Sequence, residues 1–322
     1  MKKEIWRRDG VLRFFKKNIA VDIIILFFIV APFMNASFLS AYNLSQILVQ
    51  TATTLIVAVG VMFVIITGES DLSIGGLMCL SGIVAIYLQP ELPLPVILLI
   101  VMAMGCVLGC LTGLLVSVLK LDAFIVTLGI QMIYLGVNLI ITDGQTVAGE
   151  DPAFVQWGTG KLFQFVPYAF VIALTLVVIA YWVLSRTQFG RDCYAVGGNY
   201  EVAKYAGIRV VRQKLLCYVI CGCLAALAGF FLSARMNAGN GNFGTMIPFN
   251  VHCGIVIGGT YLSGGTGGAW HTLAGILMMS VLQNVMNIIG ADAYIQQLVQ
   301  GLIIVLIIGF ACYEQTRKKQ AA

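Results

Sequence analysis

RTQFGRDCYAVGGNYEVAKYAGIRVVRQK, residues 186–214, is a polar stretch that separates two long apolar segments of this chain. It predicts a very short helix of about seven residues, because Gly197 and Gly198 break the chain, Asn199 is an N-cap residue and Gly207 supplies a stop. A helix of that length does not persist alone in water, so tertiary packing or a partner must hold it. Six of the 19 Lys and Arg residues fall in this stretch, which indicates a cytoplasmic loop. We therefore expect residues 186–214 to receive a mechanical signal from a soluble partner.

The composition of the 322-residue chain is that of a membrane protein. Hydrophobic residues make up 60% of it, charged residues 10%, and the mean hydropathy is +0.95. Soluble globular domains do not have that balance, and the apolar runs exceed the alternating segments of about ten residues that build a β-barrel. The sequence predicts an all-α polytopic membrane bundle. Nucleic-acid binding is the weaker interpretation of the net charge of +5, because the basic residues flank apolar runs.

Ten apolar runs are candidate spans of a hydrocarbon core that takes about 20 residues per helix. They cover residues 19–34, 43–66, 73–88, 94–118, 123–142, 165–184, 213–234, 248–261, 269–289 and 293–312. The third and eighth runs are short, so counts of nine or eight spans stay open. A count of ten places both termini in the cytoplasm, and the lipid bilayer then surrounds a domain over residues 19–312.

The basic residues support this orientation. Only Lys161 and Arg235 of the 19 Lys and Arg fall on the outer side. The segment 1–18 is then a basic cytoplasmic segment, either amphipathic on the inner membrane surface or a solvated flank, and 313–322 is a cytoplasmic tail. The outer connection 143–164 is either a docking surface for an extracytoplasmic partner or an interfacial loop with aromatic anchors.

A second informative stretch, ITGESDLSIGGLMCLSG at residues 66–82, places Glu69, Asp71 and Ser73 beside an apolar run. Carboxylates at membrane depth are costly and usually functional, and broken helices often line substrate paths. The stretch predicts part of a translocation path or gate, with an inner turn of solvated acids as the alternative. Polar side chains within other spans leave a similar choice open, between a path and hydrogen bonds across helices: Gln131, Asn138, Asn284 and Asn287.

Glycine patterns add two expectations. Gly105, Gly109 and Gly113 form two overlapping GxxxG units, which let another helix approach closely. The stretch IGGTYLSGGTGGAWHTLAG, residues 257–275, resembles residues 66–82 and hints at an internal duplication.

Signatures of catalysis and of metal binding are missing from the sequence. The chain contains no GxxxxGK[ST] motif, His252 and His271 lack ligand spacing, and four of the nine Cys residues lie inside apolar runs. The sequence predicts no enzyme, no cofactor and no metal site, so any ATP hydrolysis must occur in a separate subunit.

Three quoted stretches resemble the permease subunit of ribose-type carbohydrate ABC importers. GESDLSIGGLMCLSG is similar to the family's Gly-Gly-Ile-Asp-Leu-Ser-Val-Gly signature, LDAFIVTLGIQMIYLGVNLIITDGQTV at 121–147 to its Pro-Ala-Phe-Ile-Val-Thr-Leu-Gly segment, and residues 186–214 to its coupling-helix loop. VIGGTYLSGGTGG continues the match, which covers about residues 40–312. Three positions depart from the pattern: Glu69 and Ser70 replace Gly and an apolar residue, and Asp122 replaces Pro.

The resemblance implies a subunit of an ATP-driven importer in the bacterial inner membrane. It implies partners: an ATP-binding cassette subunit inside, an extracytoplasmic sugar-binding protein, and a second permease copy or paralogue. It also implies that residues 197–208 sit in a cleft of the ATPase, with contact positions Gly197, Gly198, Asn199, Glu201, Ala203, Lys204, Gly207 and Ile208. A monosaccharide would pass between the two permeases. The alternatives are an ABC permease for another solute such as a nucleoside, and an ATP-independent secondary transporter.

Overall fold

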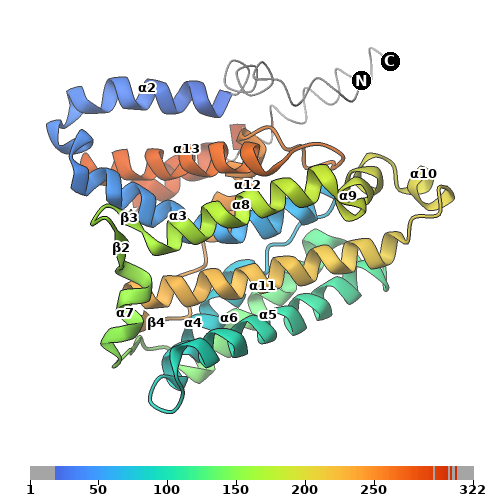
Figure 1. Ribbon diagram of the computed structural model, residues 1–322, viewed down its shortest axis with the longest axis horizontal. Helices are drawn as coiled ribbons and strands as arrows, with labels where there is room; N and C mark the ends of the chain where they lie inside the picture. Colours follow the sequence, from blue (N-terminus) through green and yellow to red (C-terminus); the bar gives the residue numbers. More distant parts are fainter. Residues whose placement is uncertain (1–18, 293, 304, 307–308, 310–322) are drawn as a thin grey trace.

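The structure, a computed structural model, describes residues 19–292, 294–303, 305–306 and 309, and most of this part of the chain is helical (Figure 1). The segments 1–18 and 313–322 lie outside the described residues. The elements are α2 (Ile19–Met34), η1 (Ala36–Leu39), α3 (Ala41–Ile66), α4 (Ile74–Leu88), α5 (Leu94–Ser117), α6 (Ala123–Ile141), β1 (Val147–Ala148), α7 (Pro152–Thr159), β2 (Lys161–Leu162), β3 (Val166–Pro167), α8 (Tyr168–Arg186), α9 (Gln188–Gly198), α10 (Tyr200–Tyr205), α11 (Val210–Met236), β4 (Ala238–Gly239), α12 (Ile247–Ile257) and α13 (Ala269–Ile288). Residues 294–303 are also helical.

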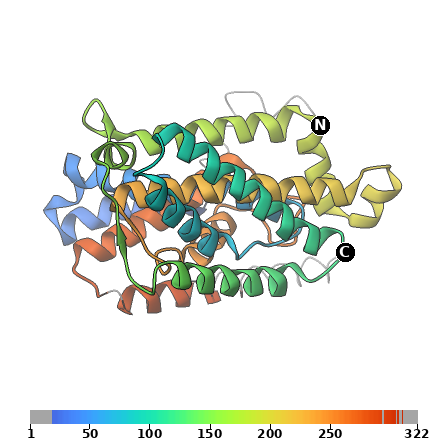
Figure 2. The ribbon, with the colours of Figure 1, turned by 90° about the horizontal axis from the view of Figure 1, so that it is seen from below.

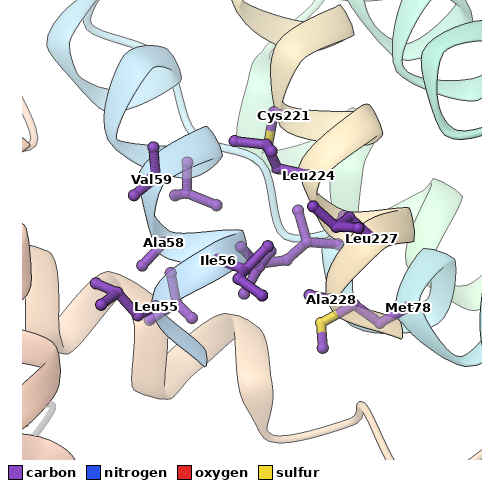
Figure 3. Close-up of a cluster of buried hydrophobic side chains, with 14 of the residues drawn as sticks. Leu55, Ile56, Ala58, Val59, Met78, Cys221, Leu224, Leu227 and Ala228 are labelled. Atoms are coloured by element: carbon purple, nitrogen blue, oxygen red, sulfur yellow. The ribbon is translucent and has the colours of Figure 1, made fainter. Parts of the chain in front are cut away.

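Helices α3 and α11 form the centre of the bundle. The most apolar stretch of α3 is 89% buried and that of α11 is 72% buried, against 22–28% for α5, α6 and α8. In Figure 3, Ile56 of α3 points toward Leu227 of α11, and Met78 of α4 lies beside Ala228; all of them belong to one buried cluster. The outer helices keep large apolar side chains exposed, as expected of surfaces that contact lipid or another membrane protein.

The glycine pattern of α5 explains its close packing on α11. A Cβ built on Gly105 would overlap the carbonyl oxygen of Gly222, and one on Gly109 would overlap that of Tyr218. A Cβ built on Gly113 would lie only 2.9 Å from the Cβ of Tyr218. The predicted close approach through GxxxG is confirmed, and α11 is the partner helix.

Five described helices are long and apolar enough to cross a bilayer: α3, α5, α6, α8 and α11. Shorter apolar helices occur at Ala20–Met34, Ile74–Leu88 and Ile247–Ile257. The 11 residues of α12 give a rod of about 16 Å, well below the ~30 Å of a hydrocarbon core. A polytopic helical membrane protein is confirmed, whereas the count of ten spans and the cytoplasmic termini stay predictions.

The connections gather at two opposite ends of the bundle. The segment with α9 and α10 projects at one end, and the connection from α6 to α8 lies at the other (Figures 1 and 2). That connection contains β1, α7, β2 and β3. Strand β2 pairs antiparallel with β3, and β1 pairs antiparallel with β4, which follows α11. Phe154 of α7 is fully buried, and its ring centroid is 5.0 Å from that of Phe230 on α11. The connection is therefore a folded cap on the bundle.

Candidate functional site

Helix α10 is the short helix that the sequence predicts, with six residues between Asn199 and Ala206. The Val202 amide donates a hydrogen bond of 3.1 Å to the Asn199 side chain, which caps the N-terminus. Glu201 lies in the first turn and Lys204 in the last, where each suits the helix dipole. Gly207 follows with φ +82°, a left-handed conformation that suits glycine and ends the helix.

The two faces of α10 have different roles. Ala203 is buried and packs with Val196, Val210 and Ile208, which fixes α10 to α9 and α11. On the other face Val202 and Tyr205 are 63% and 86% exposed. Glu201 and Lys204 are exposed as well. Of the predicted contact residues, Ala203 and Ile208 thus anchor the helix, and the exposed face offers apolar and charged groups outward.

Helix α9 continues through Gly197 and Gly198, so the predicted break at these glycines is wrong. The break comes at Asn199, which ends α9 and caps α10. The two glycines differ in their surroundings. A Cβ on Gly197 would overlap the Ile66 carbonyl oxygen at the end of α3, whereas no described atom lies within 4 Å of a Cβ on Gly198. Gly197 therefore serves a close approach of two backbones, and Gly198 faces open space.

Gly197 belongs to a junction of three chain segments, which we call the glycine junction: Gly68, Gly197, Gly264 and Gly265. The Gly265 amide donates to the Ile66 carbonyl at 2.9 Å, and a Cβ on Gly264 would lie 2.6 Å from the Gly68 nitrogen. The two sequence stretches that resemble each other, 66–82 and 257–275, thus meet here against α9. Because no side chain separates the three backbones, a displacement of α9 has little room to be absorbed.

Tyr194 provides a second bond between α9 and the loop before α13. Its hydroxyl donates to the Gly267 carbonyl at 2.8 Å. Burial raises the pKa of Tyr194 to about 12, so the hydroxyl keeps its proton and stays a donor at neutral pH. Helix α9 is therefore tied to loop 258–268 by a hydrogen bond as well as by backbone packing.

The segment between α3 and α4 runs along one face of α11. Glu69 forms an ion pair with Lys214, and the Tyr218 hydroxyl donates to the Ser70 carbonyl at 3.0 Å. One step further along α11, the fully buried Cys221 side chain interacts with Asp71. Positions 214, 218 and 221 are three or four residues apart and so share a face of the helix. The segment leads the chain from the end of α3 toward the middle of α11.

Asp71 lies inside the bundle at the start of α4. Its side chain is 2% exposed, and its Oδ1 accepts hydrogen bonds from the Ser73 amide at 2.9 Å and the Ser73 hydroxyl at 2.6 Å. The alternative of a solvated turn is wrong for this residue, although the local bond to Ser73 is a turn motif. The carboxylate holds the irregular backbone that precedes α4.

The remaining predicted path residues do not converge with Asp71. Gln131 accepts a hydrogen bond from the Gly76 amide at 2.7 Å. Asn284 and Asn43 exchange two hydrogen bonds, of 2.8 and 3.0 Å, and both are buried. Asn287 is exposed and accepts a bond from Gln296. Gln131 and Asn284 thus bond groups on neighbouring helices, and Asn287 lies at the end of α13.

Two contacts near α10 go beyond the predictions from the sequence. Lys214 counts there only among the basic residues of segment 186–214, although a lone cation at the start of an apolar run is a usable signal for an ion pair. Its ammonium also lies 5.4 Å from the ring centroid of Tyr200, the first residue of α10. Tyr194 carries no sequence signal of its own. Among the described residues no cluster of three or more His, Cys, Asp or Glu side chains is arranged to hold a metal ion.

Comparisons with known proteins identify a family of permeases and several relatives within sugar transport. Residues 43–308 match the model of the family described as branched-chain amino acid transport system / permease component. The ribose import permease protein of Bacillus subtilis is 33% identical over 93% of this chain and 93% of its own. The galactose/methyl galactoside import permease protein of Escherichia coli is 30% identical over 97% and 98%, and its xylose transport system permease protein is 33% identical over 92% and 91%. No solved structure matches the chain.

Proposed function

This chain belongs to the family described as branched-chain amino acid transport system / permease component, and we propose that it forms the translocation path for a monosaccharide in an ATP-driven importer. The monosaccharide is proposed because its relatives include permeases of ribose, galactose and xylose transport. The chain is a transport subunit of the bacterial cell membrane and not an enzyme. An ATPase subunit and a substrate-binding protein complete such a system.

The observation that carries the proposal is the continuous connection from α10 into the bundle. The exposed face of α10 presents Val202 and Tyr205. Behind it, α9 meets the loops after α3 and before α13 at the glycine junction. Lys214 joins α10 to the Glu69 segment by its contacts with Tyr200 and Glu69. A short capped helix held in this way transmits a rigid-body movement, which a floppy loop does not.

The mechanism follows from this connection. Closure of the ATPase subunits around bound ATP displaces α10, and α9 carries the displacement to the glycine junction. The loop ends of α3 and α13 then move together, and the Glu69–Asp71 segment shifts along α11. Two permeases, copies or paralogues, rock against each other and open the path alternately to the two sides.

The orientation of the chain is part of the proposal. We place α10 in the cytoplasm, in agreement with the six basic residues of segment 186–214. The folded cap with α7 then faces outward. Phe163 at the turn between β2 and β3 is 89% exposed there, as suits a surface that receives the loaded binding protein.

Uptake into vesicles tests the substrate class. The complex purified through this chain, with its binding protein, is supplied with labelled ribose, galactose, xylose and a nucleoside in turn. We expect ATP-dependent accumulation of at least one of the sugars and none of the nucleoside. Accumulation of the nucleoside alone would establish the alternative solute and reject the monosaccharide.

A further inference from the structure

An open cavity of about 530 Å³ lies between α12 and the helical residues 294–303. Its wall combines amide side chains with aromatic and aliphatic ones: Phe249, Asn250, Tyr294, Gln297, Leu298 and Gln300. Small-molecule sites are typically concave, of roughly 300–1,000 Å³, with a few polar groups on a mainly apolar wall. The size and lining of this cavity are therefore those of a site for a small polar molecule.

A smaller pocket continues from this cavity into the bundle. Asn250 and Gln300 line both spaces, and the inner one adds Thr54 of α3 with Ser280 and Gln283 of α13. Gln300 is 8% exposed. Asn250 and Gln300 thus stand where the open cavity narrows, and hydrogen-bonding side chains continue beyond them. We call this position the throat.

The polar lining reaches the middle of the bundle. Thr54 lies near the middle of α3, and Gln50 lies one turn away on the same helix. The buried Oε1 of Gln50 has no hydrogen-bond partner among the described residues. Gln50 itself lines neither space. Buried amide oxygens are usually paired, so this free acceptor, one helical turn from Thr54, is available to a hydroxyl group that passes the throat.

The chemistry of the lining favours a neutral polyhydroxy compound. The lining residues of both spaces, as far as the described chain supplies them, carry no charge. Amide side chains donate and accept hydrogen bonds, which matches sugar hydroxyls. The rings of Phe249 and Tyr294 offer apolar faces for the C–H side of a sugar. Neutral contacts of modest strength also allow release, which a transport path requires.

We propose that this cavity is the monosaccharide site of the translocation path, with Asn250 and Gln300 at its throat. The inference rests on the proposed function and adds the residues that the sugar contacts. It shifts the path from the predicted Gln131 and Asn284, whose side chains bond neighbouring helices, to amides of α12 and residues 294–303. The short α12 fits this role, since irregular backbone at membrane depth occurs where it lines a cavity.

The test uses the purified complex with Asn250→Ala and Gln300→Ala. We expect sugar uptake to fall roughly tenfold, corresponding to about 1.4 kcal/mol at the transition state. Stimulation of ATPase activity by the loaded binding protein should stay at the wild-type level, because the coupling path is untouched. Gln296→Ala is the matched control, since Gln296 is a neighbouring amide that lines neither space and bonds Asn287; its uptake should equal that of the wild type.

A conservative variant covers the case in which an alanine variant does not assemble. Asn250→Gln keeps the amide and narrows the throat, so we expect the ratio of ribose to galactose uptake to change. Unaltered rates and ratios in all three throat variants would overturn the site. Failure of the wild-type complex to transport any of the sugars would reject the proposed function instead, so the two results are distinguishable.

Discussion

Lys214 on α11 forms an ion pair with Glu69 in the segment between α3 and α4, and both side chains are largely buried, at 15% and 19% exposure. The same ammonium lies over the ring of Tyr200, where α10 begins. One cation therefore contacts both the helix proposed to meet the ATPase and the segment that leads to Asp71. Glu69 is also one of the positions at which the sequence departs from the pattern of ribose-type permeases.

Charge reversal tests this contact. Glu69→Lys or Lys214→Glu places two like charges together at a partly buried site, which is strongly unfavourable. We expect each single variant to lose sugar uptake by roughly tenfold, and the double variant Glu69→Lys/Lys214→Glu to recover much of it. Uptake is measured per amount of chain in the membrane. No recovery in the double variant would show that the pair itself does not matter.

Alanine substitutions of Gly197 and Gly198 are a matched pair of variants that tests the glycine junction. Alanine is the better helix former at both positions, so only the surroundings distinguish them. Gly197→Ala pushes a methyl group into the Ile66 carbonyl, and such overpacking costs about 1–3 kcal/mol. We expect it to abolish the ATPase response to loaded binding protein, while Gly198→Ala stays within about twofold of wild type. A normal response in Gly197→Ala would contradict the junction's role in coupling.

Two substitutions of Asp71 test whether this side chain acts by positioning the backbone before α4 or by its charge. Asp71→Ala leaves the Ser73 amide and hydroxyl without their acceptor, at a cost of about 1–3 kcal/mol for a buried donor. Asp71→Asn keeps an oxygen in the same place. We expect alanine to reduce uptake roughly tenfold and asparagine to retain most of it. Equal loss in both variants would mean that the carboxylate charge is required and would count against a positioning role.

The Asn43–Asn284 pair is expected to contribute to stability and not to the path. Polar pairs between membrane helices contribute about 0.6 kcal/mol on average and up to about 1.7. Asn43→Ala and Asn284→Ala should each lower the Tm of the purified chain, and the double variant should lower it by less than the sum. Uptake per folded molecule should not change. A change in sugar specificity in Asn284→Ala alone would return Asn284 to the path.

Local features were the part of the structure that the sequence predicted well. Asn199 and Gly207 specify α10 because capping and left-handed backbone depend on single residue types. The GxxxG units of α5 likewise predict that another helix packs closely against it. Asp122, which replaces the usual Pro, caps α6 by accepting the Ile125 amide at 3.0 Å, so this departure leaves the helix start intact.

Long-range relationships were not predictable from these residues. Gly197 and Gly198 look alike in the sequence, and only the position of Ile66 distinguishes them. The sequence places Gln131 and Asn284 among the candidates for the translocation path, because a buried amide looks the same in a sequence whether it bonds a solute or another helix. Asn250 and Gln300 were overlooked for the same reason, since their shared cavity depends on how α12 and residues 294–303 pack.

Coupling to ATP through α10 is tested most directly by purification and transport together. The tagged full chain is purified from membranes as wild type and as Glu201→Lys, which reverses an exposed charge on α10. Each preparation is analysed for an ATP-binding subunit and for sugar uptake into vesicles with and without ATP. We predict that the wild type retains the subunit and transports only with ATP, and that Glu201→Lys loses both at unchanged membrane abundance. A chain that purifies alone and moves sugar without ATP would contradict an ATP-driven permease and establish a secondary transporter.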